Sequence, residues 1–510
     1  MTGLRERFAQ LLREAPSDAH AVEFENRWYD WADLRSAGEQ LDRVLNRHGL
    51  GPDSRVGVVL ENRPEHVAVL IATIATKRCV VTLSPLQPVE RLIADIERSK
   101  VPVVVASAGV LERTGVADAL AGGGVTLRLQ PNCTIEDLGG DRRPESRLTN
   151  PGVMVEMMTS GTTGPPKRVD LADRQVDRAV SVMAAPPTDG RLVRESVSLV
   201  VAPLVHVGGL WSVLAPLYAG RRIAMLSKFA VDPWVDLVER HRPRAAGLVP
   251  AALRAVLDAE VDPARLSSLA VVTCGTTYCP PELASAFFER YGIRVLMTYG
   301  ATEFAGAVAA WTKPMHEKWW DAKKGSVGRA VPGVDLRVVD EDGTVLAPGM
   351  EGILEIRSAQ SPLGSGTWVR SSDRAVIDED GFLYIKGRTD AAIIRGGFKV
   401  HPHVVEAALR RHPSVRDAAV VPWPDRRLGQ VPVAAVEVVA GRPRPEPEEL
   451  RERCREALTP YEVPTFVVVL DQLPRSPSAK VSRVDLMAVI ESELRSRAER
   501  PAGEVVHEAG

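Results

Sequence analysis

The sequence of 510 residues is poor in cysteine, in lysine and in long apolar runs. Its five cysteines are scattered and odd in number, which excludes a disulfide framework and a zinc site of paired cysteines and predicts a cytoplasmic location. The longest apolar run, residues 67–76, is about half of the roughly 20 residues that a membrane-spanning helix needs. The N-terminal segment is charged and has no signal-peptide core, so neither secretion nor integral membrane association is expected.

Charge of one sign is also lacking, because 64 basic and 66 acidic residues leave a net charge of −2. This balance gives no reason to expect a nucleic-acid partner. The ten histidines are dispersed without HExxH-like spacing, so no metal site of that kind is expected. Only 11 of the basic residues are lysines, and a lysine inside a motif is therefore more informative here than in an average chain.

Strand and helix patterns alternate along the first 300 residues. Val- and Ile-rich segments such as residues 55–60 and 101–106 are separated by helical patterns such as residues 65–76. This alternation is typical of a parallel sheet covered by helices. From about residue 325 short strands are separated by Asp-Gly turns, which predicts a small β-barrel.

The fold class is therefore predicted to be α/β, with a large N-terminal body and a smaller C-terminal domain. The body, residues 1–388, consists of two βα-layered subdomains and the barrel-like part at about 325–388. A mobile α+β domain is expected at residues 389–498, and residues 499–510 are expected to form a flexible tail.

The most specific motif is Thr159–Val169, TSGTTGPPKRV. Its glycines let backbone amides turn toward an anion, its hydroxyls add donors and Lys167 adds a positive charge, so the segment predicts a phosphate cradle. It is not a Walker loop, because G-x-x-x-x-G-K-S/T is absent. Taken alone, a Ser/Thr/Gly linker is the alternative interpretation.

Six segments in order resemble the motifs of the adenylate-forming superfamily, which contains acyl- and aryl-CoA synthetases, adenylation domains of peptide synthetases and luciferases. The resemblance covers nearly the whole chain. Besides TSGTTGPPK, the segments are PLVHVGG at 203–209, YGATE at 299–303, RSSD at 370–373, GRTD at 387–390 and LPRSPSAK at 473–480.

The resemblance implies an AMP-forming acid–thiol ligase that uses ATP, Mg²⁺ and CoA. A carboxylate attacks the α-phosphate of ATP to give an acyl-adenylate, and a thiol then replaces AMP. The predicted function is an acyl-CoA ligase for a hydrophobic acid, either fatty, aromatic or polycyclic. Two alternatives stay open: loading of a carrier-protein thiol, and an enzyme that performs only one half-reaction, such as a non-adenylating acyl-AMP:CoA ligase. The oligomeric state is open too, with a homodimer among the alternatives.

The same resemblance implies roles for individual residues. Lys480, His206, Thr302 and Glu303 are the expected catalytic residues, with Glu303 also binding magnesium. Asp390 is the expected hinge of the mobile domain, which swings between the half-reactions. The expected nucleotide-binding residues are Thr159, Ser160, Gly161, Thr162, Thr163, Gly164, Lys167, Gly275, Thr276, Thr277, Tyr299, Gly300, Ala301, Thr302, Asp373, Ile385, Arg388 and Lys480. The expected acyl pocket consists of His206, Val207, Gly208, Gly209, Trp211, Ala305 and Gly306, and the pantetheine arm of CoA is expected at Gly396, Gly397 and Lys399.

Plainer interpretations exist for single residues. His206 alone is a packing histidine, Glu303 a solvated or salt-bridged carboxylate and Asp373 a turn residue. The motif around each favours the functional role. No acid follows His206 within residues 207–211, which argues against an amino-acid substrate.

Four positions depart from the motifs of the superfamily: Arg168, Tyr278, Ser372 and Ala479 stand where glycine or proline is usual. Their side chains are expected to crowd the approach of the nucleotide, which is why the loss of one half-reaction stays open. The pair Trp319-Trp320 lies outside every motif and is expected to pack at the surface.

Overall fold

The computed structural model describes residues 3–87, 89–113, 115–121, 124–141, 146–159, 167–276, 278–364, 366–388, 393–395, 398–425, 428–476 and 480–498. Within these ranges no helix combines the length and the apolar character that crossing a membrane requires. The chain divides into two compact units. The large unit takes the described residues up to Ser371 together with Val376–Tyr384, and the small unit takes Ser372–Ala375 and the described residues from Ile385 onward.

The first sheet of the large unit has seven strands in the order β7-β6-β5-β3-β4-β8-β9. Its inner pairs are parallel, and an antiparallel strand lies at each edge. The strands are β3 (Arg55–Val59), β4 (Cys79–Leu83), β5 (Val103–Ser107), β6 (Val125–Leu129), β7 (Ile135–Asp137), β8 (Val153–Thr159) and β9 (Lys167–Ala172). The helices between them are α3 (Pro64–Ala75), α4 (Val89–Ser99), α5 (Ala108–Leu111) and α6 (Val116–Ala121).

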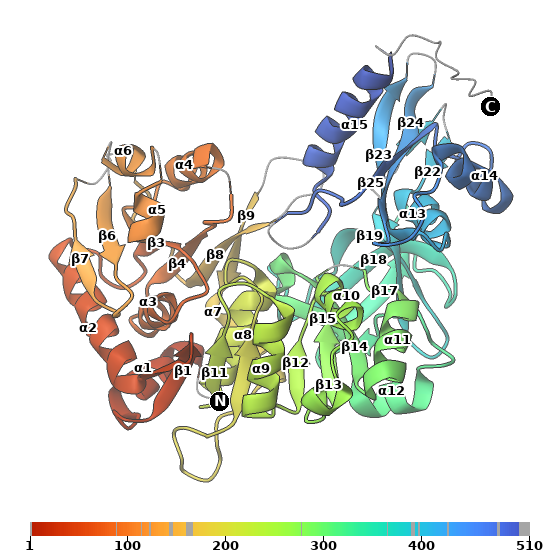
Figure 1. Cartoon of the computed structure of the whole chain (residues 1–510). Coiled ribbons are helices and arrows are strands. Elements are labelled where there is room, and N and C mark those ends of the chain that lie inside the picture. Colours follow the sequence, from red (N-terminus) through yellow and green to blue (C-terminus); the bar gives the residue numbers. More distant parts are fainter. Residues whose placement is uncertain are drawn as a thin grey trace, which may run out of the picture. The chain divides into compact units, whose positions relative to one another are not determined.

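Helices cover both faces of this sheet, because successive side chains of a strand point to opposite faces. Val56 and Val58 join one hydrophobic core with α3 and with the helices α1 (Leu4–Glu14) and α2 (Trp31–Arg47). Cys79 and Val81 join another core with α4, α5 and α6. Figure 1 shows the two helical layers on opposite sides of the strands. All residues of β3 and β4 are buried, and burial on both faces explains why most of them are apolar.

Two further sheets complete the α/β part of the large unit. A four-stranded sheet has the order β10-β11-β1-β2, and a five-stranded sheet the order β12-β13-β14-β15-β16. The strands are β1 (His20–Phe24), β2 (Arg27–Asp30), β10 (Val197–Val200), β11 (Arg222–Met225), β12 (Ala245–Gly247), β13 (Val271–Cys274), β14 (Arg294–Ala301), β15 (Gly306–Ala310) and β16 (Arg329–Ala330). The helices are α7 (Asp173–Met183), α8 (Val207–Tyr218), α9 (Val231–His241), α10 (Pro250–Asp258), η1 (Pro263–Leu266), α11 (Pro281–Tyr291), η2 (Thr302–Phe304) and α12 (Lys313–Trp319).

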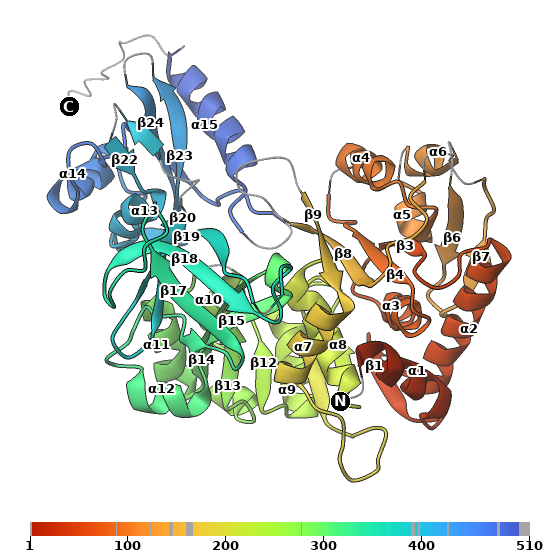
Figure 2. The same ribbon diagram turned by 180° about the vertical axis from the view of Figure 1, so that it is seen from behind.

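The region predicted to be a small barrel folds as a four-stranded sheet in the order β17-β18-β19-β20 (Figure 2). Its strands are β17 (Val334–Val339), β18 (Glu351–Ser358), β19 (Val369–Ile377) and β20 (Leu383–Arg388). The sequence places the domain boundary at residue 388, and the two units divide after Tyr384, so both positions lie in β20.

The small unit contains a sheet in the order β22-β21-β24-β23, to which β25 adds by parallel pairing with β24. Its strands are β21 (Ile393–Arg395), β22 (Phe398–Val400), β23 (Val415–Asp425), β24 (Gly429–Val438) and β25 (Phe466–Leu470). Its helices are α13 (Pro402–Arg410), α14 (Pro447–Ala457) and α15 (Arg483–Ala498). Residues 499–510, the predicted tail, lie outside the described residues.

Trp320 is buried, in contrast to the expectation that the pair Trp319-Trp320 packs at the surface, whereas Trp319 is half-buried. Trp320 is only 8% exposed and stacks on the buried ring of His316, with 4.6 Å between the ring centroids. Trp311 meets both rings edge-on. Burial holds the pKa of His316 at about 4, so this histidine is neutral at physiological pH and packs as an apolar ring.

Candidate active site

Three chain segments meet at one edge of the five-stranded sheet. The strands β13 and β14 are parallel neighbours, so the residues that follow Cys274 and the end of β14 lie at the same edge. The start of α8 joins them, because a Cβ built on Gly208 would lie 3.7 Å from Cγ2 of Thr276. A Cβ on Gly306 would lie 3.1 Å from the indole nitrogen of Trp211. The structure thus brings the motifs PLVHVGG and YGATE together with Gly275 and Thr276.

His206 is the residue before α8, and its position depends on a residue that sequence reasoning missed. Asn62 lies buried in the loop between β3 and α3. Its amide nitrogen donates to the carbonyls of Ala202 and Leu226, both at 3.1 Å, and its side-chain oxygen accepts from the amide of Leu204 at 2.9 Å. Asn62 therefore fixes the turn that leads to His206. The sequence signal for this role is weak, an Asn three residues after the end of β3.

The motif glycines serve close backbone packing. A Cβ on Gly209 would lie 1.9 Å from the carbonyl oxygen of Pro203, and one on Gly300 would lie 2.0 Å from that of Gly306. A Cβ on Gly275 would lie 2.4 Å from Oγ1 of Thr298. None of these positions accepts a side chain without movement of neighbouring atoms, so the walls of the site are bare backbone.

Two residues of the site have left-handed backbone conformations. Thr276 has φ of 70° and Ala305, which caps η2, has φ of 52°. Such conformations are costly for residues with a Cβ, most of all for a β-branched one, and they cluster at functional sites. Thr276 follows the end of β13, and Ala305 lies in the turn between β14 and β15.

Glu303 lies in η2, and Gln175 of α7 holds its backbone. Gln175 is 1% exposed, and its amide nitrogen donates to the carbonyls of Glu303 at 3.3 Å and Gln360 at 2.8 Å. In the described part of the chain the carboxylate of Glu303 forms no ion pair. A single available carboxylate fits magnesium, which binds to few protein ligands and takes the rest from phosphates and water.

The predicted phosphate cradle is bounded by β8 and β9, which pair so that Thr159 lies opposite Lys167 and Met158 opposite Arg168. Lys167 is exposed at the start of β9. Ser160, Gly161, Thr162, Thr163 and Gly164 lie outside the described residues. The backbone of Thr159 ends β8, and its side chain is not described.

Arg168 does not crowd the nucleotide in the way that the sequence suggested. Its guanidinium binds Oδ1 of Asp95 on α4 at 2.8 Å and the carbonyl of Thr82 on β4 at 3.2 Å. Adjacent residues of a strand point to opposite faces, so this side chain extends away from the face that carries Lys167. Arg168 therefore ties β9 to the sheet and to α4.

The remaining described site residues belong to the small unit. Asp373 is on β19, and Ile385 and Arg388 are on the neighbouring strand β20. Lys480 is half-buried, and burial together with the charge of Arg388 lowers the pKa of its ammonium group. Two cations within electrostatic range of each other form a place where a phosphate would be favoured.

Some predicted residues cannot be placed. Thr277, Asp390, Gly396, Gly397 and Ala479 lie outside the described residues. Lys399 is described only as backbone of β22.

Of the other departures, Ser372 is half-buried on β19, next to Asp373. Tyr278 is 58% exposed. The segment that contains it is flanked by Cys274 and Cys279, and a hydrogen bond to Cys279 together with burial raises the pKa of the Cys274 thiol. A neutral, buried thiol packs as an apolar group, so Cys274 is not a candidate nucleophile.

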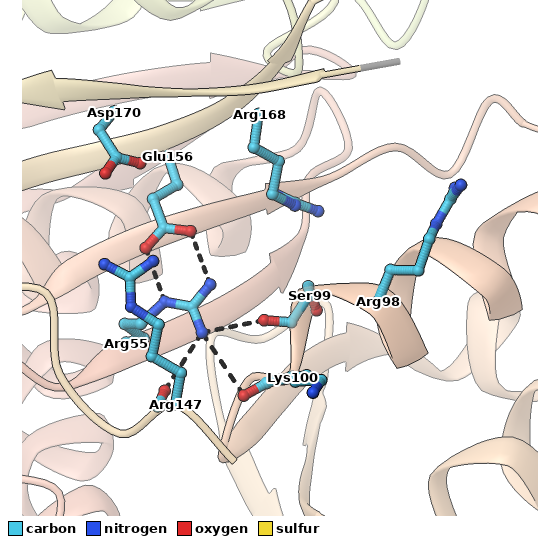
Figure 3. A pocket seen from close by; sticks show the side chains of 8 residues that line it. All are labelled: Arg55, Arg98, Ser99, Lys100, Arg147, Glu156, Arg168 and Asp170. Carbon is cyan, nitrogen blue, oxygen red and sulfur yellow. Dashed lines mark hydrogen bonds and ion pairs between the residues drawn. The ribbon is translucent and has the colours of Figure 1, made fainter. Parts of the chain in front are cut away.

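A basic cavity of about 350 Å³ lies at a different place in the large unit (Figure 3). It is lined by Arg55, Arg98, Ser99, Lys100, Arg147, Glu156, Arg168 and Asp170. None of the predicted site residues lines it. The guanidinium of Arg55 binds both carboxylate oxygens of Glu156 at 2.6 Å, and both side chains are 2% exposed. The buried charges are thus already paired, and the cavity is not the nucleotide site.

The fold and the site define an adenylate-forming enzyme. The model of the AMP-binding enzyme family matches residues 8–364, and that of the AMP-binding enzyme C-terminal domain matches residues 404–480. The chain therefore belongs to the AMP-binding enzyme family, which confirms the predicted superfamily and fold class.

Three similar proteins illustrate the relationship. Indoleacetate–CoA ligase of Aromatoleum aromaticum is 31% identical, with 92% of this chain and 95% of that protein covered. A 4-coumarate–CoA ligase of Oryza sativa is 29% identical, with coverages of 90% and 87%. The structure of the amide bond synthetase McbA of Marinactinospora thermotolerans has a TM-score of 0.78 at 27% identity and covers 95% of this chain and 99% of that one. The predicted class, an AMP-forming acid–thiol ligase, agrees with the names of the first two.

Proposed function

We propose that this protein is an ATP-dependent ligase that activates an aromatic or other apolar carboxylic acid as its acyl-adenylate and transfers the acyl group to the thiol of CoA. The observation that carries the proposal is the meeting of the start of α8, the end of β13 and the turn from β14 to β15 around bare glycine backbone. Small and apolar residues beside a nucleotide-binding motif suit an acid whose carboxylate must reach ATP.

The proposed reaction has two steps. In the first, a carboxylate oxygen attacks the α-phosphorus of ATP, and the bond to pyrophosphate breaks. In the second, the sulfur of CoA attacks the carbonyl carbon, AMP leaves with the bonding electrons and the thiol proton passes to solvent. Lys480 supplies positive charge where it develops in the first step, and Thr302 donates to the α-phosphate. Magnesium neutralises phosphate charge when bound, and Glu303 is its proposed protein ligand.

The acyl pocket supports an aromatic or otherwise bulky apolar acid. Gly208 leaves room, because a Cβ there would meet only Cγ2 of Thr276 at 3.7 Å, and Trp211 supplies a flat apolar wall that is 6% exposed. Two relatives named for indoleacetate and 4-coumarate point in the same direction. Among the described residues the indole N–H of Trp211 has no hydrogen-bond acceptor, so an oxygen on the acid is a fitting partner for it.

A panel of carboxylic acids tests the proposal. Pyrophosphate release is measured with ATP and each acid, with and without CoA, and the thioester is identified by its mass. We expect acid-dependent pyrophosphate release and a CoA thioester for aromatic acids. Absence of pyrophosphate release for every acid, together with thioester formation from a supplied acyl-adenylate, would instead identify the half-reaction alternative.

The acceptor is tested in the same assay. Replacing CoA by a phosphopantetheinylated carrier protein tests the carrier alternative. Replacing CoA by a simple amine tests amide formation, because McbA, which is 27% identical to this chain, is named an amide bond synthetase. A product with either acceptor and none with CoA would contradict the proposed transfer step.

The proposed location of the protein is the cytoplasm. CoA as the acceptor and five cysteines that are all free thiols support this location.

A further inference from the structure

Asp417 on β23 and Glu437 on β24 are direct cross-strand partners in the sheet of the small unit. The side chain of Glu437 is only 5% exposed and that of Asp417 only 24%. Two carboxylates directly opposite each other repel, so this pair destabilises the sheet unless a cation lies between them.

Arg475 provides that cation. Its Nη2 atom lies 2.9 Å from Oδ2 of Asp417 and 3.1 Å from Oε2 of Glu437. Burial alone would raise the pKa of Asp417, but Arg410 and Arg475 together hold it below its ordinary value. Asp417 is therefore charged, and its contact with Arg475 is a charge-assisted hydrogen bond.

Arg475 is also part of the loop that carries Lys480. It forms an antiparallel bridge with Val481. The amide of Ser476 donates to the carbonyl of Lys480 at 2.6 Å, and that of Ser482 donates to the carbonyl of Pro474 at 2.8 Å. The backbone of Lys480 is thus hydrogen-bonded to the residue that follows Arg475.

Glu437 holds the same loop at a second point. Its Oε2 atom accepts from the amide of Leu473 at 3.0 Å, in addition to Arg475. The loop is therefore attached to the sheet at Leu473 and at Arg475, and it is closed on itself at Lys480. Without the guanidinium, one attachment of the loop would be lost together with the cation that contacts both carboxylates.

We propose that Arg475 is a positioning residue for adenylation: by bridging Asp417 and Glu437 it fixes the loop that places the ammonium group of Lys480. This inference rests on the proposed function of Lys480. It concerns the first half-reaction alone, because Lys480 has no proposed role in the transfer to CoA. A misplaced lysine is expected to lower the rate of acyl-adenylate formation strongly, since catalysis by fixed charge depends on its position.

The variant Arg475→Met tests this inference, with Arg410→Met as its matched control. Arg410 of α13 binds the same carboxylate, with 2.9 Å between its Nε atom and Oδ1 of Asp417, and it forms no hydrogen bond or ion pair with the described residues of the Lys480 loop. Both variants remove one cation from Asp417. Only Arg475→Met releases the loop.

We expect Arg475→Met to lower the rate of pyrophosphate formation about 10- to 100-fold. It should leave thioester formation from a supplied acyl-adenylate within about twofold of the wild type. Arg410→Met should leave both rates near wild type, and Arg475→Lys should restore part of the adenylation rate because it returns a charge to the carboxylates. Circular dichroism checks that each variant is folded.

Three outcomes overturn the inference. Equal slowing of both half-reactions by Arg475→Met would indicate a general structural role, and so would equal slowing of adenylation by Arg410→Met. An adenylation rate unchanged in Arg475→Met would show that the loop holds Lys480 without the bridge. If Arg475→Met does not fold, Glu437→Gln, which keeps the side-chain shape, is measured with the same assay. Failure of the wild-type protein to release pyrophosphate would contradict the proposed function instead.

Discussion

Two loops carry the lysines that are proposed to face the phosphates, and they are anchored in different ways. In the large unit Lys167 is followed by Arg168, whose partner Asp95 has a side chain only 2% exposed. The other carboxylate oxygen of Asp95 has no hydrogen-bond partner among the described residues. In the small unit Arg475 binds two acids, and each has a second arginine: Arg410 for Asp417, and Arg416 for Glu437 at 3.4 Å.

Both loops thus have an arginine near the lysine. The effect of losing that arginine depends on whether the carboxylate that it binds has another cationic partner. A buried carboxylate with one cation depends on that cation completely, since a buried charge without a partner is very costly. A carboxylate shared by two arginines keeps part of its stabilisation when one is lost. The anchor at Arg168 should therefore matter mainly for stability and the anchor at Arg475 mainly for position.

The largest effect is expected from Arg168→Met. Removal of its guanidinium leaves Asp95 charged, buried and without an ion pair, so the large unit should lose about 3–5 kcal/mol of stability. Urea unfolding followed by tryptophan fluorescence measures this, because eight of the nine tryptophans belong to the large unit. The double variant Asp95→Leu/Arg168→Met removes both charges and should regain most of the loss. A loss of stability below about 1 kcal/mol in the single variant, as is usual for an exposed ion pair, would contradict the view that Arg168 acts mainly on stability.

The second largest effect is expected from Lys480→Ala. Loss of a fixed charge at the developing transition state typically costs about 10²- to 10³-fold in rate, so pyrophosphate formation should fall by that factor. Thioester formation from supplied acyl-adenylate should stay near wild type. Lys167→Ala is the matched change in the other loop, and we expect it to raise the KM for ATP as well. Equal loss of both half-reactions in Lys480→Ala would contradict the assignment of Lys480 to adenylate formation alone.

A third prediction concerns pH. Burial and Arg388 lower the pKa of Lys480 from the ordinary value of 10.5, and only the protonated form supplies charge. The value of kcat/KM for ATP in adenylation should therefore fall with rising pH at a lower pH than an unperturbed lysine would give. The lowered pKa also means that protonated Lys480 destabilises the folded state. The free energy of unfolding should therefore rise as the pH rises from the lowered pKa toward the ordinary value.

Lys480→Arg is the control for the pH dependence, because arginine stays protonated throughout this range. Its profile should lack the alkaline fall, whatever its absolute rate. An identical alkaline fall in Lys480→Arg and wild type would assign the titration to another group.

Much of the fold was predictable because it follows from local patterns of apolar and polar residues. The helices and strands from β3 to β5 follow from continuous apolar segments and the helical periods between them. The pairing of β1 with β11 was not predictable, because it joins segments that are far apart in the sequence. The barrel-like region shows Asp-Gly turns in the sequence, but the order of its strands comes only from the structure.

The candidate site divides in the same way. The motifs identified the residues that lie beside the substrates, because substrate chemistry dictates their type and order. They did not identify Asn62, Gln175 or Asp95, which hold those residues from other elements. The expected crowding by Arg168 was wrong for the same reason: its partner Asp95 is on α4, and nothing near Arg168 in the sequence points to it. Anchors of this kind depend on which elements pack together, which no local pattern contains.

The smallest effects are expected from single changes around Asp417. Arg410→Met or Arg475→Met should each cost the small unit about 1 kcal/mol, because the other arginine remains. The double variant leaves Asp417 without either cation, so its loss should exceed the sum of the two single losses by about 1–2 kcal/mol. Hydrogen exchange of the β23 and β24 amides measures all three stabilities in the intact chain. Additive losses would mean that the two arginines do not share the carboxylate, and the anchor in the small unit would then resemble the one at Arg168 after all.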